Sequence, residues 1–207
     1  MPRLLHSSIH DDASRAGDFT IRSALKSHGA AVHQTQFVTD QYVVTSIGGS
    51  TFVFAPGLDG RFRVDRMNRQ LYRVDVAAQN PRPEQVRSLL GDLEIECDES
   101  PVEIDGRRCR VFRVHNRDAR LVVSIECYCA RIEGLERSAL VAEREFDGAF
   151  QPFQLPLDDD EIVVRSTTRA LAADFEQSQT VQLVALEPRI EGRDLWEEVL
   201  RYPMQRG

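Results

Sequence analysis

Short runs of alternating apolar and polar residues, separated by tight turns, occupy most of this 207-residue chain. Alternation places successive side chains on opposite faces of an extended strand, a pattern typical of antiparallel sheets. The dipeptide Asp105-Gly106 lies between two such runs and is the strongest hairpin signal, because both residues tolerate the left-handed backbone of a two-residue turn. The sequence therefore predicts a mainly β (α+β) protein.

The predicted strands share this alternation and end at turn-forming residues. They cover residues 19–25, 32–47, 51–55, 61–65, 71–76, 102–104, 109–115, 121–132, 162–169 and 181–186. Apolar residues recur at helical spacing in three other segments, which are 80–91, 134–146 and 194–200. Because no repeat or linker divides the chain, we expect a single domain over residues 1–207, with residues 1–17 as a mobile segment.

Composition and charge exclude several classes of protein. The formal net charge of -7 argues against a nucleic-acid binder, because affinity for phosphates comes from basic charge. The chain contains neither a run of about 20 apolar residues, which a membrane span needs, nor a signal peptide at its amino terminus. We therefore expect a cytoplasmic protein without a membrane span, in which the four cysteines are thiols or metal ligands before they are disulfides.

Three sets of segments carry a resemblance to a known superfamily: residues 60–65 with 70–75, residues 104–112, and residues 126–130 with 134–136. They resemble the periplasmic lipoprotein-carrier superfamily, the LolA/LppX-like fold, and its relatives in sigma-factor regulator sensors. The resemblance implies a strongly curved antiparallel sheet, a half-barrel, with a few short helices on its concave side. Those carriers are exported and this chain shows no export signal, so only the fold and an apolar concave site are carried over.

The cysteines form one candidate site. Cys127 and Cys129 lie two apart on a predicted strand and share a face, while Cys109 lies on the preceding strand. Depending on the register, Cys109 either faces one of them or misses both. A metal or redox site is one interpretation, although the chain lacks the Cys-x2-Cys spacing of structural zinc. The simpler interpretation is that the three are small buried apolar residues.

Arginines form the second candidate site. They cluster in residues 61–73, with five arginines against one aspartate, and in residues 107–120, with six against one. The candidates for binding an anion or an acidic partner are Arg61, Arg63, Arg66, Arg73, Arg108 and Arg110. If the two hairpins are neighbours in the sheet, as the resemblance suggests, these arginines gather on one face. The simpler interpretation is a solvated face that is paired with acidic residues.

Two other charged features are interpreted as structural. The run Asp158–Glu161 lacks the spaced ligands and the glycine of a calcium loop, so it predicts a solvated turn before a strand. His33 and His115 lie on predicted strands without a recognisable catalytic motif around them. The sequence therefore assigns no catalytic residue and no cofactor.

Three functions remain open. The leading hypothesis is a non-catalytic binding protein for a hydrophobic or lipid-like small molecule, held on the concave side of the sheet. The second is an interaction or regulatory module that binds an acidic partner through its arginines. The third is a small pathway enzyme of the cyclase or isomerase type, which a titratable side chain at the floor of a pocket would favour. Pairing of sheet edges into a homodimer is a further expectation.

Overall fold

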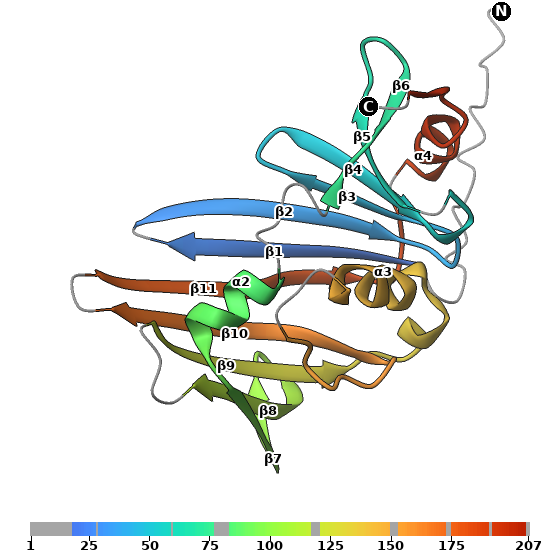
Figure 1. Ribbon diagram of the computed structural model, residues 1–207. Helices are drawn as coiled ribbons and strands as arrows, with labels where there is room; N and C mark the ends of the chain where they lie inside the picture. Colours follow the sequence, from blue (N-terminus) through green and yellow to red (C-terminus); the bar gives the residue numbers. More distant parts are fainter. Residues whose placement is uncertain are drawn as a thin grey trace, which may run out of the picture.

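The computed structural model describes residues 18–27, 29–58, 60–76, 83–116, 121–149, 153–172, 175–190 and 192–205. Twelve strands of this part form one curved, unclosed sheet (Figure 1). They are β1 (Phe19–Ser27), β2 (Ala30–Val38), β3 (Val43–Ile47), β4 (Ser50–Ala55), β5 (Gly60–Asp65), β6 (Gln70–Arg73), β7 (Leu93–Ile104), β8 (Arg107–Asn116), β9 (Val122–Arg131), β10 (Glu161–Ala172), β11 (Phe175–Glu187) and β12 (Met204–Gln205). The predicted mainly β fold is confirmed.

Three short α-helices accompany the sheet in the described part of the chain. They are α2 (Pro83–Leu90), α3 (Ala139–Gly148) and α4 (Arg193–Val199), with short 3-10 turns η1 (Pro56–Leu58) and η2 (Leu135–Arg137). The three predicted helices therefore exist, although the predicted start of the first, at residues 80–82, lies outside the described residues. None of the described helices is long and apolar enough to cross a membrane.

The chain builds the sheet outward from its middle. From β1 it runs strand by strand through β2 to β6, crosses the sheet by way of α2 and starts again at the far edge with β7. It then returns through β8, β9, β10 and β11, which pairs with β1. All of these pairs are antiparallel, and the two-residue β12 adds a parallel pair at the other edge, beside β6.

Contacts of α3 show how strongly the sheet curves. Glu143 bonds to Arg61 of β5, and the adjacent Arg144 bonds to the backbone of Glu161, where β10 begins. Six strand-to-strand steps separate β5 from β10, which is about 29 Å on a flat sheet with about 4.8 Å between strands. Two adjacent residues of a short helix reach both strands because the sheet wraps around α3, so α3 lies on the concave face.

Neighbouring residues of β3 mark the two faces. Val43 belongs to a core cluster that includes residues of α3, whereas Val44 belongs to a cluster that includes residues of α4. Two ring contacts agree with this division: Phe54 meets Phe146 of α3 at 5.3 Å between centroids, and Phe37 meets Trp196 of α4 at 5.4 Å. The expectation of helices on the concave side thus holds for α3, whereas α4 covers the opposite face.

One predicted strand is in fact two. The stretch 32–47 contains neither glycine nor proline, yet β2 ends at Val38 and β3 begins at Val43. The Thr39 hydroxyl oxygen accepts hydrogen bonds from the backbone N–H groups of Gln41 and Tyr42, at 3.0 and 2.9 Å, and so closes a tight turn. By contrast, the predicted hairpin at Asp105-Gly106 is present, with φ values of 49° and 75°.

Candidate ligand site on the concave face

An apolar cleft lies on one side of α3, between the helix and strands β9 and β10. Its volume is about 440 Å³, which falls within the usual range of about 300–1,000 Å³ for small-molecule sites. The apolar lining residues are Ile125, Cys127, Val141, Phe153, Leu155, Leu157 and Val163. Charged and amide groups line the rest of this cleft: Arg144, Glu145, Asp147, Gln154 and Asp159.

Strand alternation explains the apolar wall of this cleft. Ile125 and Cys127 are two apart on β9 and therefore point to the same face. Cys129 continues that row and pairs with Val163 across β10. The segment after α3 lays Leu155 and Leu157 against the same cluster. The wall is therefore formed by the concave side of the sheet and closed by the segment that follows α3.

A second, more polar cleft of about 450 Å³ lies on the other side of α3. Strands β2 to β5 and the residues after β6 contribute Gln34, Gln36, Thr45, Ile47, Phe52, Arg61, Val74 and Val76, and α3 contributes Glu143 and Asp147. Arg61 Nη2 donates to both carboxylates, at 2.7 Å to Glu143 Oε1 and 2.8 Å to Asp147 Oδ2. An ion-paired trio therefore forms one wall of this polar cleft.

Burial sets the electrostatics of the trio. The Glu143 side chain is only 6% exposed. This burial raises the pKa of the Glu143 carboxyl to about 7, and the charge of Arg61 offsets only part of the rise. Burial also disfavours the charged form of Arg61, but the two carboxylates outweigh it and raise the pKa of the guanidinium. The charge of the trio therefore falls by one unit as Glu143 ionises near neutral pH.

Asp147, near the end of α3, contributes to the lining of both clefts. Its Oδ2 accepts the hydrogen bond from Arg61, whereas its Oδ1 is buried without a hydrogen-bond partner among the residues that the structure describes. A buried carboxylate oxygen without a donor is costly in a folded protein.

Comparisons with known proteins give a general structural likeness. No protein-family model and no curated protein matches the chain. Among solved structures, the chain is similar to PNGF-II (10% identity, TM-score 0.46, covering 93% of this chain and 31% of that one). It is also similar to MucB (12%, 0.43, 89% and 58%) and to a DUF1329 family protein from Desulfovibrio piger ATCC 29098 (9%, 0.20, 87% and 88%).

These matches carry no argument about family or ligand, because the identities and the TM-scores are low. The chain also spans only about a third of the length of PNGF-II and less than two thirds of that of MucB. The resemblance to lipoprotein carriers therefore stays a prediction. What this chain does has to follow from its own clefts.

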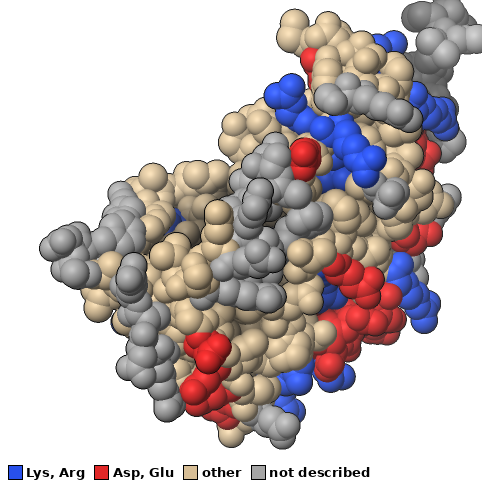
Figure 2. All heavy atoms as spheres, viewed as in Figure 1, with Lys and Arg blue, Asp and Glu red and all other residues tan. Residues whose placement is uncertain are grey.

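The six arginines singled out in the sequence do not gather in one place on the sheet. Strands β5 and β8 lie near opposite edges of the sheet, with seven strands between them. The expectation that the two arginine-rich hairpins are neighbours is therefore wrong, because the crossover through α2 carries the chain to the far edge. In the view shared by Figure 1 and Figure 2, basic side chains lie over the β5–β6 end of the sheet and acidic side chains lie around α3.

Arginines of the β5–β6 hairpin mostly contact aromatic rings. Arg63 lies over Tyr72, with its guanidinium carbon 5.5 Å from the ring centroid, and Arg66 lies over Trp196 at 4.6 Å. The Arg73 side chain lies beside Gly60. These contacts fix the guanidinium groups against the hairpin and α4, and an anion-binding role for them stays a prediction.

Arg110 reaches a buried acid that the sequence did not reveal. Its Nε and Nη2 donate to Glu161 Oε1 and Oε2 at 2.8 and 2.5 Å, and the Glu161 side chain is 1% exposed. The predicted solvated turn at Asp158–Glu161 is therefore wrong for its last residue, which turns inward because Arg110 pairs with it. Arg108, in contrast, is exposed and lies opposite Glu103 on β7.

The cysteines do not form one cluster. Cys109 pairs in register with Ala130 and Arg110 with Cys129, so Cys109 points to the opposite face from Cys127 and Cys129. All three are buried free thiols. Burial raises the pKa of each, to about 11 for Cys127. Because the thiolate is the form that reacts and binds metal, this environment favours the packing interpretation.

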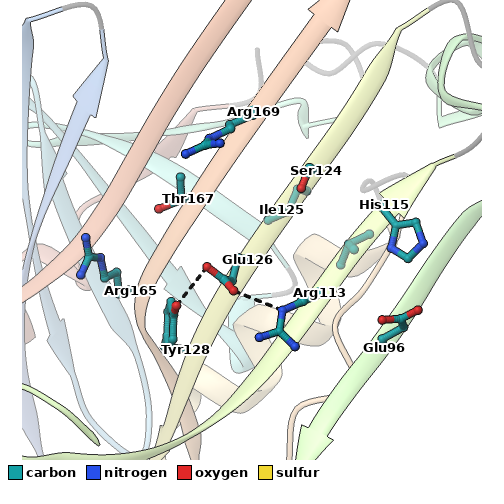
Figure 3. A pocket seen from close by; sticks show the side chains of 11 residues that line it. Glu96, Arg113, His115, Ser124, Ile125, Glu126, Tyr128, Arg165, Thr167 and Arg169 are labelled. Atoms are coloured by element: carbon teal, nitrogen blue, oxygen red, sulfur yellow. Dashed lines mark hydrogen bonds and ion pairs between the residues drawn. The ribbon is translucent and has the colours of Figure 1, made fainter. Parts of the chain in front are cut away.

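A third hollow lies on the convex face, across β7 to β10 (Figure 3). Arg113, Glu126 and Arg165 project from three of these strands, and Glu126 occupies the centre. Its carboxylate accepts hydrogen bonds from Arg113 Nε at 3.2 Å and from the Tyr128 hydroxyl at 2.9 Å. His115 lies at one end, where Nε2 is 3.1 Å from Glu94 Oε2. This hollow of about 540 Å³ is thus lined by a polar sheet surface, on which Arg113 and Glu126 pair with each other.

Sequence reasoning missed Glu143 and Asp147, the acids that define the polar cleft. One signal for Glu143 was available: it lies four residues after the buried Ala139, on the helix face that packs toward the sheet. An acid at such a position is unusual unless it is paired. Its partner Arg61 lies 82 residues away along the chain, so the pair could not be found from local pattern.

Proposed function

We propose that this chain is a non-catalytic binding protein for a hydrophobic or lipid-like small molecule, held in the apolar cleft beside α3. The observation that carries the proposal is the apolar wall of that cleft. Sheet residues such as Ile125 and Val163 face Val141 of α3 across a space of about 440 Å³. Soluble proteins usually fill such a concave apolar surface with side chains, unless a ligand uses it.

The apolar area of a ligand gives an estimate of the binding free energy that such a cleft can contribute. Burial of roughly 200 Å² of apolar ligand surface contributes about 5 kcal/mol at about 25 cal/mol per Å². Micromolar affinity corresponds to about 8 kcal/mol. An apolar chain alone therefore falls short, and polar contacts at the rim of the cleft have to supply the remainder.

Binding can be tested with a neutral fluorescent probe. Purified protein is titrated with N-phenyl-1-naphthylamine, whose emission rises in an apolar site, and is also examined by native mass spectrometry and organic extraction. Val141→Asp places a carboxylate in the cleft wall and should weaken probe binding at least about tenfold. The matched control is Val184→Asp on β11, where the valine is 61% exposed, and this variant should bind like the wild type.

The possible outcomes distinguish binding in the apolar cleft from binding elsewhere and from a general effect of added charge. Equal probe affinity in the wild type and in Val141→Asp would mean that the probe binds elsewhere and would remove the proposal. Loss of binding in both variants would indicate a general effect of added charge. Thermal unfolding of each variant shows whether the fold has been kept.

As a second candidate, we propose a small enzyme that uses acid–base chemistry in the polar cleft. The observation that favours it is Glu143, because its pKa of about 7 suits proton transfer near neutral pH. The test incubates any molecule extracted from the protein with the wild type and with Glu143→Gln, and follows its mass and isomer composition by chromatography. Conversion by the wild type alone would support this candidate, and an unchanged molecule with both proteins would count against it.

A further inference from the structure

One end of the hollow on the convex face is basic. Arg165 and Arg169 project from β10 and line this hollow, and Thr167 lies between them (Figure 3). The three residues occupy alternate positions of one strand and therefore share a face. The Cα atoms of the two arginines are about 14 Å apart along the strand, so their guanidinium groups form two separate points of contact.

Both arginines are available to a ligand. Their side chains are exposed, and neither forms a hydrogen bond or an ion pair with another residue in the described part of the chain. Arg113, which lines the same hollow from β8, bonds instead to Glu126 and lies 3.5 Å from Asp98. The ion pairing across this surface therefore ends at β9 and leaves two cations on β10.

The strand beside β10 surrounds the arginines with polar, uncharged groups. The residues of β11 opposite Arg165, Thr167 and Arg169 are Gln182, Thr180 and Ser178, respectively. One strand further along the same row, the exposed Lys26 of β1 lies opposite Thr180 and adds a third cation to this face. The basic end of the hollow therefore also carries hydroxyl groups that can donate to an anion.

Acidic side chains near this end leave the two arginines unpaired. Glu126, opposite Thr167, already accepts hydrogen bonds from Arg113 and Tyr128. Asp105, in the turn before β8, accepts a hydrogen bond from Gln182 at 3.4 Å, and the exposed Glu176 lies opposite Leu171. Neither of these two acids forms an ion pair with Arg165 or Arg169 in the structure that is described.

We propose that this end of the hollow binds an elongated small molecule with two anionic groups, one at Arg165 and the other at Arg169. Phosphate and carboxylate groups both fit, because a planar guanidinium donates two parallel hydrogen bonds to either. The hydroxyl of Thr167 lies between the two guanidinium groups, where the middle of such a molecule passes. The site lies on the opposite face of the sheet from the apolar cleft beside α3, so it is independent of the binding function proposed above.

The test titrates the protein separately with phosphate, linear tripolyphosphate and suberate, at constant low ionic strength because salt screens exposed charges. Two-dimensional ¹H–¹⁵N NMR follows the Nε–H signals of the arginines, and the signals that disappear in Arg165→Gln and Arg169→Gln identify these two residues. At least one of the two elongated probes should shift both signals with a single Kd, at least about fivefold lower than that of phosphate, because it contacts two cations instead of one. The probe that binds more tightly shows whether the site takes phosphate or carboxylate groups.

Arg165→Gln and Arg169→Gln each remove one contact and should weaken binding of that elongated probe about fivefold, to the level of phosphate. Arg201→Gln, at an exposed position after α4, removes the same charge elsewhere and should bind like the wild type. Equal affinity for all three probes, a shift of only one of the two signals, or no binding would overturn the proposal. So would binding that both glutamine variants leave unchanged. N-phenyl-1-naphthylamine should bind equally to the wild type and to these variants, so this site and the apolar cleft stand or fall separately.

Discussion

Replacing Glu143 with glutamine should remove a large pH-dependent contribution to stability. In the folded protein the pKa of this carboxyl is raised from 4.5 to about 7 because it is buried on α3. Folding therefore favours its protonated form, and its contribution to stability is fully present below pH 4.5 and is lost as the pH rises to about 7. The difference between the two pKa values corresponds to about 3 kcal/mol.

Urea unfolding at several values between pH 5 and pH 8 measures this contribution. Over this range the wild type should lose about 2.5 kcal/mol more than Glu143→Gln, because glutamine keeps the shape of the protonated acid and does not ionise. The matched control is Glu145→Gln, since Glu145 lies on the same helix but is exposed. Its stability should follow the wild-type curve.

Parallel curves for the wild type and Glu143→Gln would refute the reasoning. They would mean that Arg61 compensates fully for the burial of Glu143, so that this acid ionises in the folded protein as easily as in the unfolded chain. If the free energy of unfolding fell more steeply with pH in Glu143→Gln than in the wild type, the inferred pKa shift of Glu143 would have the wrong sign. Either result would also remove the argument that the charge of the polar cleft changes near neutral pH.

Three further predictions concern stability and thiol reactivity. Arg110→Met removes the charged partner of the buried Glu161 carboxylate and leaves it the backbone N–H of Asp158 as a donor, so it should lower the free energy of unfolding by about 3–5 kcal/mol; a loss below about 1 kcal/mol would contradict this reasoning. Leu71→Ala removes a fully buried side chain and should cost about 2–5 kcal/mol in urea unfolding, whereas Leu171→Ala at a 52% exposed position should change stability by no more than about 0.5 kcal/mol. In the native protein a thiol reagent such as DTNB should label one cysteine rapidly, the exposed Cys97, because the other three thiols are buried; rapid labelling of more than one thiol would contradict the burial.

Local features of the fold could be predicted because local chemistry determines them. The turn at Asp105-Gly106 needs positive φ values, which these residues tolerate, and the structure has them. Cys127 and Cys129 share a face because they are two apart on one strand. The face to which Cys109 points, however, depends on the register between β8 and β9, which is set by the turn that joins them. The sequence therefore left the position of Cys109 open, and the structure places it on the other face.

Long-range order could not be predicted from the same signals. The sequence pattern indicated that strands adjacent along the chain pair in antiparallel fashion. No local pattern predicts that β7 lies at the far edge of the sheet or that β11 pairs with β1. The arginine hairpins were placed together because sequence pattern does not encode that crossover. The turn at Thr39 was missed for a different reason, since a threonine hydroxyl replaces the glycine or proline that usually marks a turn.

The position of Glu143 on α3 is itself an argument for function. A residue that packs on the concave face and ionises at a cost lowers the stability of the folded protein at neutral pH. An apolar residue of similar volume, together with an apolar partner in place of Arg61, would fill the same space and is often neutral or stabilising. Stability alone therefore does not account for the ion pair on this face. The proposed ligand site would account for it, because functional sites are where proteins depart from the most stable choice of residues.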